Sequence, residues 1–245
     1  MIAGRLVRVV TARPAFVPLQ RRRLVGRSVR PVAYGVVVAT AAVTTVLGVM
    51  LAGRRTFTDF DLRYDVRIGR WFAGHERLAL RLADLGSTVP VVLAIATIAL
   101  MMLVLRRLRA VALAVLAPPL AILVTDHVLK PLIDRAPFGV YTYPSGHTTA
   151  AFAVATVIVL LVLDETNAGA RAVRWTVAVA VAALACFVAL GLVAAGYHYF
   201  TDTIGGAGVG ISVVVVAALV IDAIADRRAP APPTPSVPEA QRVSA

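Results

Sequence analysis

Residues 144–163 read PSGHTTAAFAVATVIVLLVL, an apolar run that contains no Asp, Glu, Lys or Arg. A bilayer core takes roughly 20 mainly apolar residues of helix, so this run predicts a membrane-spanning helix. Serine is a strong N-cap, and the first-turn N–H groups that follow it lack intrahelical partners and can bind an anion. The stretch therefore predicts a membrane helix that begins after Ser145 and whose first turn can hold an anion.

The composition of the whole chain places this helix in a polytopic membrane protein. The 245 residues are 59% hydrophobic and have a mean hydropathy of +0.83, which is too apolar for a soluble domain. Six stretches qualify as spans. They are Pro31–Gly53, Leu85–Leu105, Ala110–Leu129, Gly146–Leu163, Trp175–Tyr197 and Thr203–Ile221. The sequence predicts an all-α bundle of six transmembrane helices.

The arginines predict the orientation of the bundle. In a soluble protein, a net charge of +12 would favour a nucleic-acid partner. Here most arginines lie in segments on one side of the predicted membrane, as the positive-inside rule describes. One side carries eight between Arg5 and Arg30, then Arg106, Arg107, Arg109, Arg171, Arg174, Arg227 and Arg228. On the other side, five acidic residues between the first two spans offset five of the seven arginines there. We expect cytoplasmic N- and C-termini in a bacterial plasma membrane, and no nucleic-acid partner.

Three segments lie outside the six spans. Residues 1–30 predict a basic cytoplasmic arm and not a removable signal peptide, because no long apolar core stands beside a small-residue cleavage site. The Pro/Ala-rich residues 227–245 predict a disordered cytoplasmic tail after the membrane domain, residues 31–226. Between the first two spans, apolar residues recur at helical spacing. They predict a helix lying in the outer interface, or an ordinary loop helix packed on the bundle.

Polar residues gather in two loops that this topology places on the extracytoplasmic side. Lys130 and Arg135 follow the third span and can neutralise phosphate oxygens, although such residues more commonly snorkel from a helix end. Gly146 lets a phosphoryl oxygen approach its backbone N–H, Ser145 adds a hydroxyl, and His147 can reach a leaving-group oxygen. The alternative interpretation is an N-cap serine, a flexible glycine and an interfacial histidine.

His198 and Asp202 follow the fifth span at helical spacing. The carboxylate can accept a hydrogen bond from one imidazole nitrogen and leave the other free as a nucleophile. The alternative is a histidine within an aromatic belt. An aspartate at membrane depth needs a partner, which favours the functional interpretation. The same four-residue spacing predicts that Asp126 pairs with Lys130.

Together these residues resemble the type 2 phosphatidic acid phosphatase superfamily, membrane lipid-phosphate phosphatases related to vanadium haloperoxidases. The likeness covers about Phe57 to Asp226. The family's motifs are a lysine followed after six residues by Arg-Pro, then Pro-Ser-Gly-His, then Ser-Arg, five residues, His, three residues and Asp. The second motif is intact, but Pro137 holds the first arginine position and Gly191-Leu192 replaces the Ser-Arg pair. Arg135, two residues early, is expected to substitute for the first arginine.

The resemblance implies a metal-independent hydrolase that needs no cofactor. By it, His198 would attack phosphorus to give a phosphohistidine, Asp202 would orient His198, and His147 would protonate the leaving oxygen. The phosphoryl group would be held by Lys130, Arg135, Ser145 and Gly146. With four histidines and no cluster at metal-ligand spacing, the sequence also disfavours a metal hydrolase.

Three functions remain open at this point. The first is hydrolysis of a lipid phosphate, such as a polyprenyl diphosphate or phosphatidate, at the outer leaflet. The second is a phosphotransferase that passes phosphate from the same histidine to a lipid or sugar alcohol. The third is a lipid-phosphate-binding protein weakened by its missing arginines, since losing one such donor costs about 10²- to 10³-fold in rate.

Overall fold

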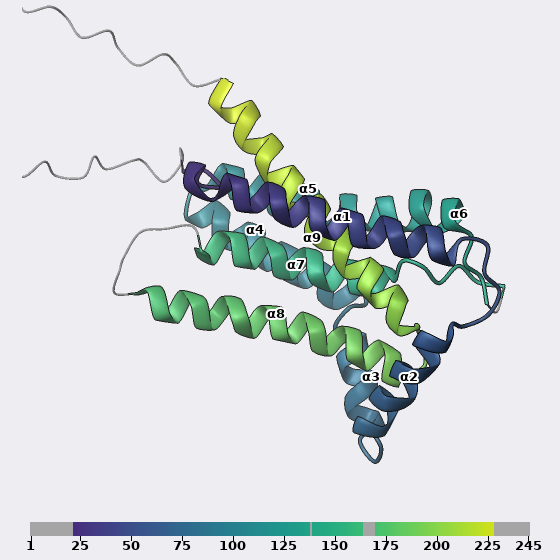
Figure 1. The fold of residues 1–245 in the computed structure, drawn as a ribbon. Coiled ribbons are helices and arrows are strands. Elements are labelled where there is room, and N and C mark those ends of the chain that lie inside the picture. Colours follow the sequence, from purple (N-terminus) through teal and green to yellow (C-terminus); the bar gives the residue numbers. More distant parts are fainter. Residues whose placement is uncertain (1–21, 138, 164–169, 228–245) are drawn as a thin grey trace, which may run out of the picture.

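The computed structural model describes residues 22–137, 139–163 and 170–227, and every regular element within them is helical (Figure 1). The elements are a 3₁₀ turn (Arg27–Val29), α1 (Arg30–Leu51), α2 (Asp59–Trp71), α3 (Glu76–Asp84), α4 (Thr88–Val104), α5 (Leu108–Leu123), a π-helical segment (Val124–Leu129), α6 (Lys130–Ile133), α7 (Gly146–Leu163), α8 (Arg171–Ala194) and α9 (Phe200–Arg227). Residues 1–21 of the predicted arm and 228–245 of the predicted tail lie outside the described residues.

Helix α9 is the centre of the bundle. It packs against α1, α5 and α7, and α7 in turn packs against α8. In its most apolar window 44% of α9 is buried, against 11% of α1, so α1 lies at the periphery. The long helices run alongside one another, while α2 and α3 gather at one end (Figure 1). The prediction of an all-helical membrane bundle is confirmed.

Within the described residues, five helical stretches are long and apolar enough to cross a membrane, or six if the bent pair α3–α4 counts as one span. The predicted second span begins too early at Leu85. Helix α4 begins only at Thr88, because Ser87 is extended (ψ 168°) and the chain turns by 50° between α3 and α4. The predicted fifth span ends too late at Tyr197, since α8 stops at Ala194.

A glycine explains where α8 stops. Gly196 has φ +73°, in the left-handed region that glycine adopts without strain. The Tyr197 N–H donates to the Leu192 carbonyl at 3.0 Å and the Gly196 N–H donates to Val193 at 3.0 Å. This Schellman-type ending turns the chain back towards the bundle. It places His198 in the short connection before α9.

The segment between the first two spans forms α2 and α3. Helix α2 begins with a capping box, in which Thr58 Oγ1 accepts from the Asp61 N–H at 3.0 Å and the Asp61 carboxylate accepts from the Thr58 N–H at 3.3 Å. Ile68 is only 2% exposed, whereas Trp71 is 65% exposed. Helix α2 therefore packs on the bundle through one face and presents an aromatic side chain outward.

At the other end of the bundle, the N-terminal segment is joined to the last helix. The buried Asp222 carboxylate accepts from the Leu24 N–H at 3.0 Å and from the Val25 N–H at 2.9 Å. Arg109, at the start of α5, forms ion pairs of 3.0 Å with Asp222 and 3.2 Å with Asp226. Helix α9 ends at Arg227, six residues beyond the predicted end at Ile221, and these contacts stabilise its last turns.

Two glycines let α9 approach the loop before α7. A Cβ atom on Gly205 would overlap the Tyr143 ring, and one on Gly206 would lie 2.5 Å from the Ser145 carbonyl oxygen. Small residues of this kind let backbones in membrane helices come close together. The contact fixes the start of α7 against the start of α9, where Asp202 lies.

We expect Gly206→Ala to lower the unfolding midpoint of the purified protein in detergent. The added methyl must displace the Ser145 carbonyl, and overpacking of this kind costs about 1–3 kcal/mol. Gly35→Ala is the matched control, because a Cβ there meets nothing within 4 Å and alanine favours helix. Equal midpoints for the two variants, measured by thermal unfolding, would contradict the close approach.

Candidate active site

The Pro-Ser-Gly-His motif forms the beginning of α7, as predicted. Ser145 Oγ accepts from the Thr148 N–H at 3.3 Å, which is the geometry of an N-cap. The Ser145 N–H donates to the Asp202 carbonyl at 3.0 Å, so the motif is tied directly to α9. Ser145 is fully buried while His147 is exposed. The first turn of α7 therefore has a fixed backbone and an accessible imidazole.

The structure brings the two predicted histidines together from distant parts of the chain. The ring centroids of His147 and His198 lie 6.4 Å apart, with 58° between their planes. His147 comes from the start of α7, and His198 from the connection between α8 and α9. The predicted convergence of the two loops is confirmed.

A cation lies beside the first turn of α7. The Lys130 ammonium pairs with Asp126 Oδ1 at 2.7 Å, so the predicted Asp126–Lys130 pair is confirmed. A Cβ atom on Gly146 would lie 3.1 Å from Asp126 Oδ1 and 3.7 Å from Lys130 Nζ. The ammonium therefore faces the Gly146 backbone, where the sequence predicted a phosphoryl group.

Arg135 is the buried cation of the site. Its Nη1 donates to Asp202 Oδ1 at 2.5 Å and to Thr201 Oγ1 at 2.7 Å, and its Nη2 donates to Asp61 Oδ2 at 2.6 Å. The Tyr199 ring covers the guanidinium at 4.8 Å. Arg135 has no exposed surface, and its terminal nitrogens are used by two carboxylates. These contacts differ from the predicted contact with phosphate and favour a role in positioning Asp202.

The second oxygen of Asp202 faces the predicted nucleophile. His198 Nδ1 lies 3.6 Å from Asp202 Oδ2, which also accepts from the Tyr199 N–H at 3.1 Å. This distance is longer than a hydrogen bond, and His198 Nδ1 has no hydrogen-bond partner. Catalytic hydrogen bonds are commonly long in unliganded enzymes and tighten in the substrate complex. The four-residue spacing predicted a hydrogen bond between these two groups; the structure places the carboxylate beside this imidazole nitrogen without forming that bond.

Asp61 completes the buried charge network, and sequence reasoning did not single it out. Its Oδ1 accepts from the Thr201 N–H at 3.0 Å and from Thr201 Oγ1 at 2.8 Å. Burial alone would raise the pKa of Asp61, but the Thr201 hydrogen bonds and the Arg135 charge outweigh burial and lower the pKa. The capping box of Thr58 and Asp61 signals a helix that starts at Asp59. Nothing in the sequence links Asp61 to Arg135, which lies 74 residues away.

A second carboxyl of α2 lies close to this network. Asp65 accepts from the Phe200 N–H at 3.0 Å. Burial, reinforced by the nearby charges of Asp61 and Asp202, raises the pKa of Asp65 to about 6. Because the folded state binds this proton more tightly, the stability that Asp65 contributes is greatest below about pH 4 and is lost as the pH rises through about 6.

The positions that carry Ser-Arg in the family pack against α3 in this chain. Leu192 is fully buried in an apolar cluster with Ala83 and Val188. A Cβ atom on Gly191 would lie 2.8 Å from the Ala79 carbonyl oxygen. An arginine at Leu192 would enter this apolar contact, where an unpaired charge is costly. In this chain, positions 191 and 192 therefore belong to the α3–α8 interface.

No arrangement of three or more His, Cys, Asp or Glu side chains suited to a metal ion occurs among residues 22–137, 139–163 and 170–227. Three of the carboxylates in this region are paired with protein cations. Asp202 and Asp61 pair with Arg135, and Asp126 pairs with Lys130.

Comparisons with known proteins identify the family and the fold. The sequence model of the PAP2 superfamily matches residues 87–225, which is more than half of the chain. The fold is similar to the crystal structure of the first transmembrane PAP2 type phosphatidylglycerolphosphate phosphatase from Bacillus subtilis, with a TM-score of 0.60 and 19% identity. That likeness covers 79% of this chain and 97% of the other. No curated protein matches the sequence. The match to the family model over more than half of its length shows that this chain belongs to the PAP2 superfamily.

Proposed function

We propose that the chain is a membrane phosphatase that removes phosphate from a lipid phosphate or polyprenyl diphosphate through a phosphohistidine. The observation that carries the proposal is the pair of imidazoles 6.4 Å apart, one facing a carboxylate and the other at an anion-binding helix start. Two contacts of about 2.6–3.2 Å each would place one tetrahedral group between the two rings. PAP2 membership supports a phosphatase, and the apolar bundle supports a lipid substrate.

In this mechanism His198 is the nucleophile. Its Nδ1 faces Asp202, which leaves Nε2 to form a bond with phosphorus. The bond from that phosphorus to the leaving oxygen breaks; this oxygen is the lipid alcohol oxygen of a monoester or the bridging oxygen of a diphosphate. Protonated His147 gives its proton to that oxygen. Water then attacks the phosphohistidine and gives a proton to His147. The Nε2–P bond breaks, inorganic phosphate leaves, and both histidines return to their starting states.

The phosphoryl oxygens would be held by Lys130 of α6 and by two groups at the start of α7. Lys130 Nζ supplies positive charge, and the Gly146 N–H and the Ser145 hydroxyl supply donors. Arg135 would act indirectly, because its buried guanidinium binds Asp202 and not the substrate. The cation count next to phosphate would therefore be lower than in relatives that keep both arginines.

The distribution of arginines supports an extracytoplasmic site. Arg23, Arg30 and Arg109 cluster around Asp222 and Asp226, at the end of the bundle opposite the histidines. By the positive-inside rule this end faces the cytoplasm of a bacterial plasma membrane. The histidine pocket would then face the outer leaflet.

The apolar contact at Leu192 favours a second candidate, a lipid-phosphate-binding protein that turns over weakly or not at all. Losing one charge-stabilising donor costs about 10²- to 10³-fold in rate. Such a protein would bind the same ligands, but it would form no phosphohistidine.

We expect the purified protein to release phosphate from at least one of three lipids, polyprenyl diphosphate, phosphatidate or phosphatidylglycerol phosphate, with a chelator present. His198→Ala should abolish both release and acid-labile ³²P labelling of the protein, and His147→Ala should slow release by about 10²- to 10⁴-fold. His75→Ala, at an exposed histidine, is the matched control. Binding without labelling would support the non-enzymatic candidate. Label that appears only in an added alcohol would indicate a phosphotransferase.

We also expect Asp61→Asn to lower kcat with little change in KM. Without the Asp61 charge, Arg135 and hence Asp202 lose their fixed positions, while Lys130 and Gly146 still bind phosphate. Removing one partner of a buried ion pair costs about 3–5 kcal/mol, so the unfolding midpoint should fall as well. Asp59→Asn, an exposed carboxyl of the same helix, is the control. A rise in KM without a loss in kcat would instead place Arg135 directly on the phosphate.

A further inference from the structure

Helices α2 and α3 form a hairpin that leaves the bundle sideways. Figure 1 shows the two helices beside the end of α8, with their connecting turn, residues 72–75, on the side away from the bundle. The turn is tight, since the His75 N–H donates to the Phe72 carbonyl at 2.8 Å. Helix α3 also bends away from α4 by 50°. The hairpin therefore departs obliquely from the spans instead of extending one of them.

The contact between α3 and α8 sets the depth of this α2–α3 hairpin in the membrane. A Cβ atom on Gly191 would lie 2.8 Å from the Ala79 carbonyl oxygen and 3.1 Å from the Ala83 nitrogen. Gly191 stands three residues before the end of α8 at Ala194, which is a rise of about 4.5 Å. Helix α3 thus packs beside the last turn of a membrane helix and not beyond its end.

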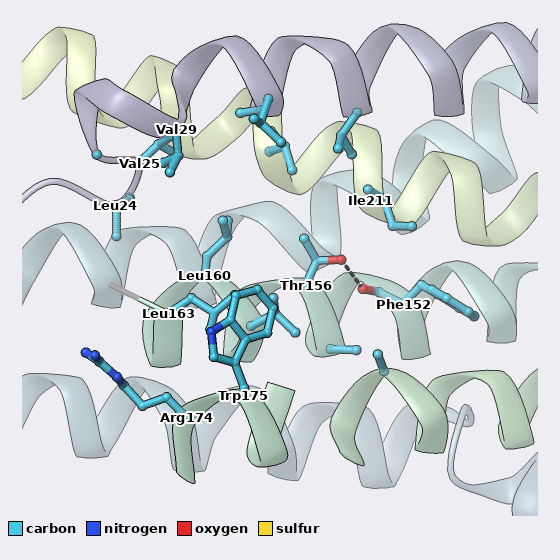
Figure 2. Close-up of a pocket in the computed structure, with 18 of the residues that line it drawn as sticks. Leu24, Val25, Val29, Phe152, Thr156, Leu160, Leu163, Arg174, Trp175 and Ile211 are labelled. Atoms are coloured by element: carbon cyan, nitrogen blue, oxygen red, sulfur yellow. Dashed lines mark hydrogen bonds between the residues drawn. The ribbon is translucent and has the colours of Figure 1, made fainter. Parts of the chain in front are cut away.

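Trp175 indicates the membrane boundary at the other end of α8. Its ring lies next to Leu163 in an apolar groove between α1 and α8 (Figure 2). Tryptophan is enriched at both membrane–water interfaces. From Trp175 to Gly191 the helix rises about 24 Å, slightly less than a bilayer core of about 30 Å. The contact of α3 with Gly191 therefore lies close to the opposite boundary of the core.

Exposed apolar side chains flank the turn of the hairpin. Trp71, the last residue of α2, is 65% exposed, and Leu78, in the first turn of α3, is 49% exposed. The small residues Ala79 and Ala83 fill the contact with α8 instead. The larger apolar groups of the hairpin thus point away from the protein, at the depth where lipid surrounds the bundle.

Much of the remaining exposed surface of the hairpin is basic. Five exposed arginines outnumber three exposed acidic residues; they are Arg63, Arg67, Arg70, Arg77 and Arg81 against Asp59, Glu76 and Asp84. Charged side chains are costly in the hydrocarbon core, but long arginine side chains can extend to the interface. Arginine together with tryptophan and leucine is typical of a helix that lies in the interface. The boundary of the core is the depth that suits both kinds of side chain.

We propose that the α2–α3 hairpin rests in the leaflet on the histidine side of the membrane, with Trp71 and Leu78 inserted between headgroups and acyl chains. Helix α2 also carries Asp61, which pairs with the buried Arg135. The hairpin therefore anchors the candidate site at the level of the headgroups. This membrane contact is independent of the proposed catalysis.

The test uses the fact that the chain has only two tryptophans. Full-length Trp175→Phe, with Trp71 as its sole tryptophan, is reconstituted in phosphatidylcholine vesicles whose acyl chains carry bromine either near the headgroup or near the chain end. Bromine quenches tryptophan on contact, and iodide in the buffer reports exposure to water. We expect bromine near the headgroup to lower Trp71 emission by about twofold or more, and bromine at the chain end to lower it less.

Arg70→Trp in a Trp71→Phe/Trp175→Phe background is the matched control. Position 70 is exposed at the same end of α2 but points about 100° around the helix from position 71. We expect iodide to quench the tryptophan at position 70 several times more strongly than Trp71. The difference in emission between the wild type and Trp71→Phe gives the Trp71 signal without any substitution of Trp175.

Two results would overturn the proposal. Trp71 emission that responds to iodide but not to brominated lipid would place the hairpin in water. Protection of Trp71 from both quenchers would mean that a second copy of the chain or another protein covers it. Because the readout is fluorescence and not phosphate release, a failure here would leave the proposed catalysis untouched.

Discussion

The buried ion pairs of Arg135 connect three parts of the chain that otherwise touch little. Asp61 comes from α2, Asp202 from the first turn of α9, and Arg135 from the loop between α6 and α7. A charge so completely removed from solvent is stable only when it is paired and hydrogen-bonded, so these three segments must adopt one arrangement together. The position of the His198–Asp202 pair follows from that arrangement.

Backbone packing supports the same arrangement from the other side. The glycines of α9 let Ser145 come within reach of Asp202, and the Ser145 N–H then donates to the Asp202 carbonyl. Asp202 is thus held through its side chain by Arg135 and through its backbone by the Pro-Ser-Gly-His loop. The two halves of the site are joined at a single residue.

Local patterns in the sequence were sufficient for the helices, the N-cap at Ser145 and the Asp126–Lys130 pair, because each depends on residues a few positions apart. The convergence of His147 and His198 was also predictable, since counting membrane crossings places both loops on one side. The partners of Arg135 were not predictable, because Asp202 and Asp61 lie 67 and 74 positions away from it in the sequence. The break before Thr88 was missed for a related reason. The same apolar run in a sequence is compatible with one straight helix and with two helices that meet at 50°.

The anchoring of the N-terminal segment has a consequence for how the protein is made. Leu24 and Val25 are among the first described residues to leave the ribosome, yet their N–H groups are satisfied by Asp222, 198 and 197 positions later. Helix α1 has little buried surface of its own with which to hold its place. Its docking must therefore await synthesis of the last helix, and a nascent chain that lacks α9 would carry a first helix free to drift in the bilayer.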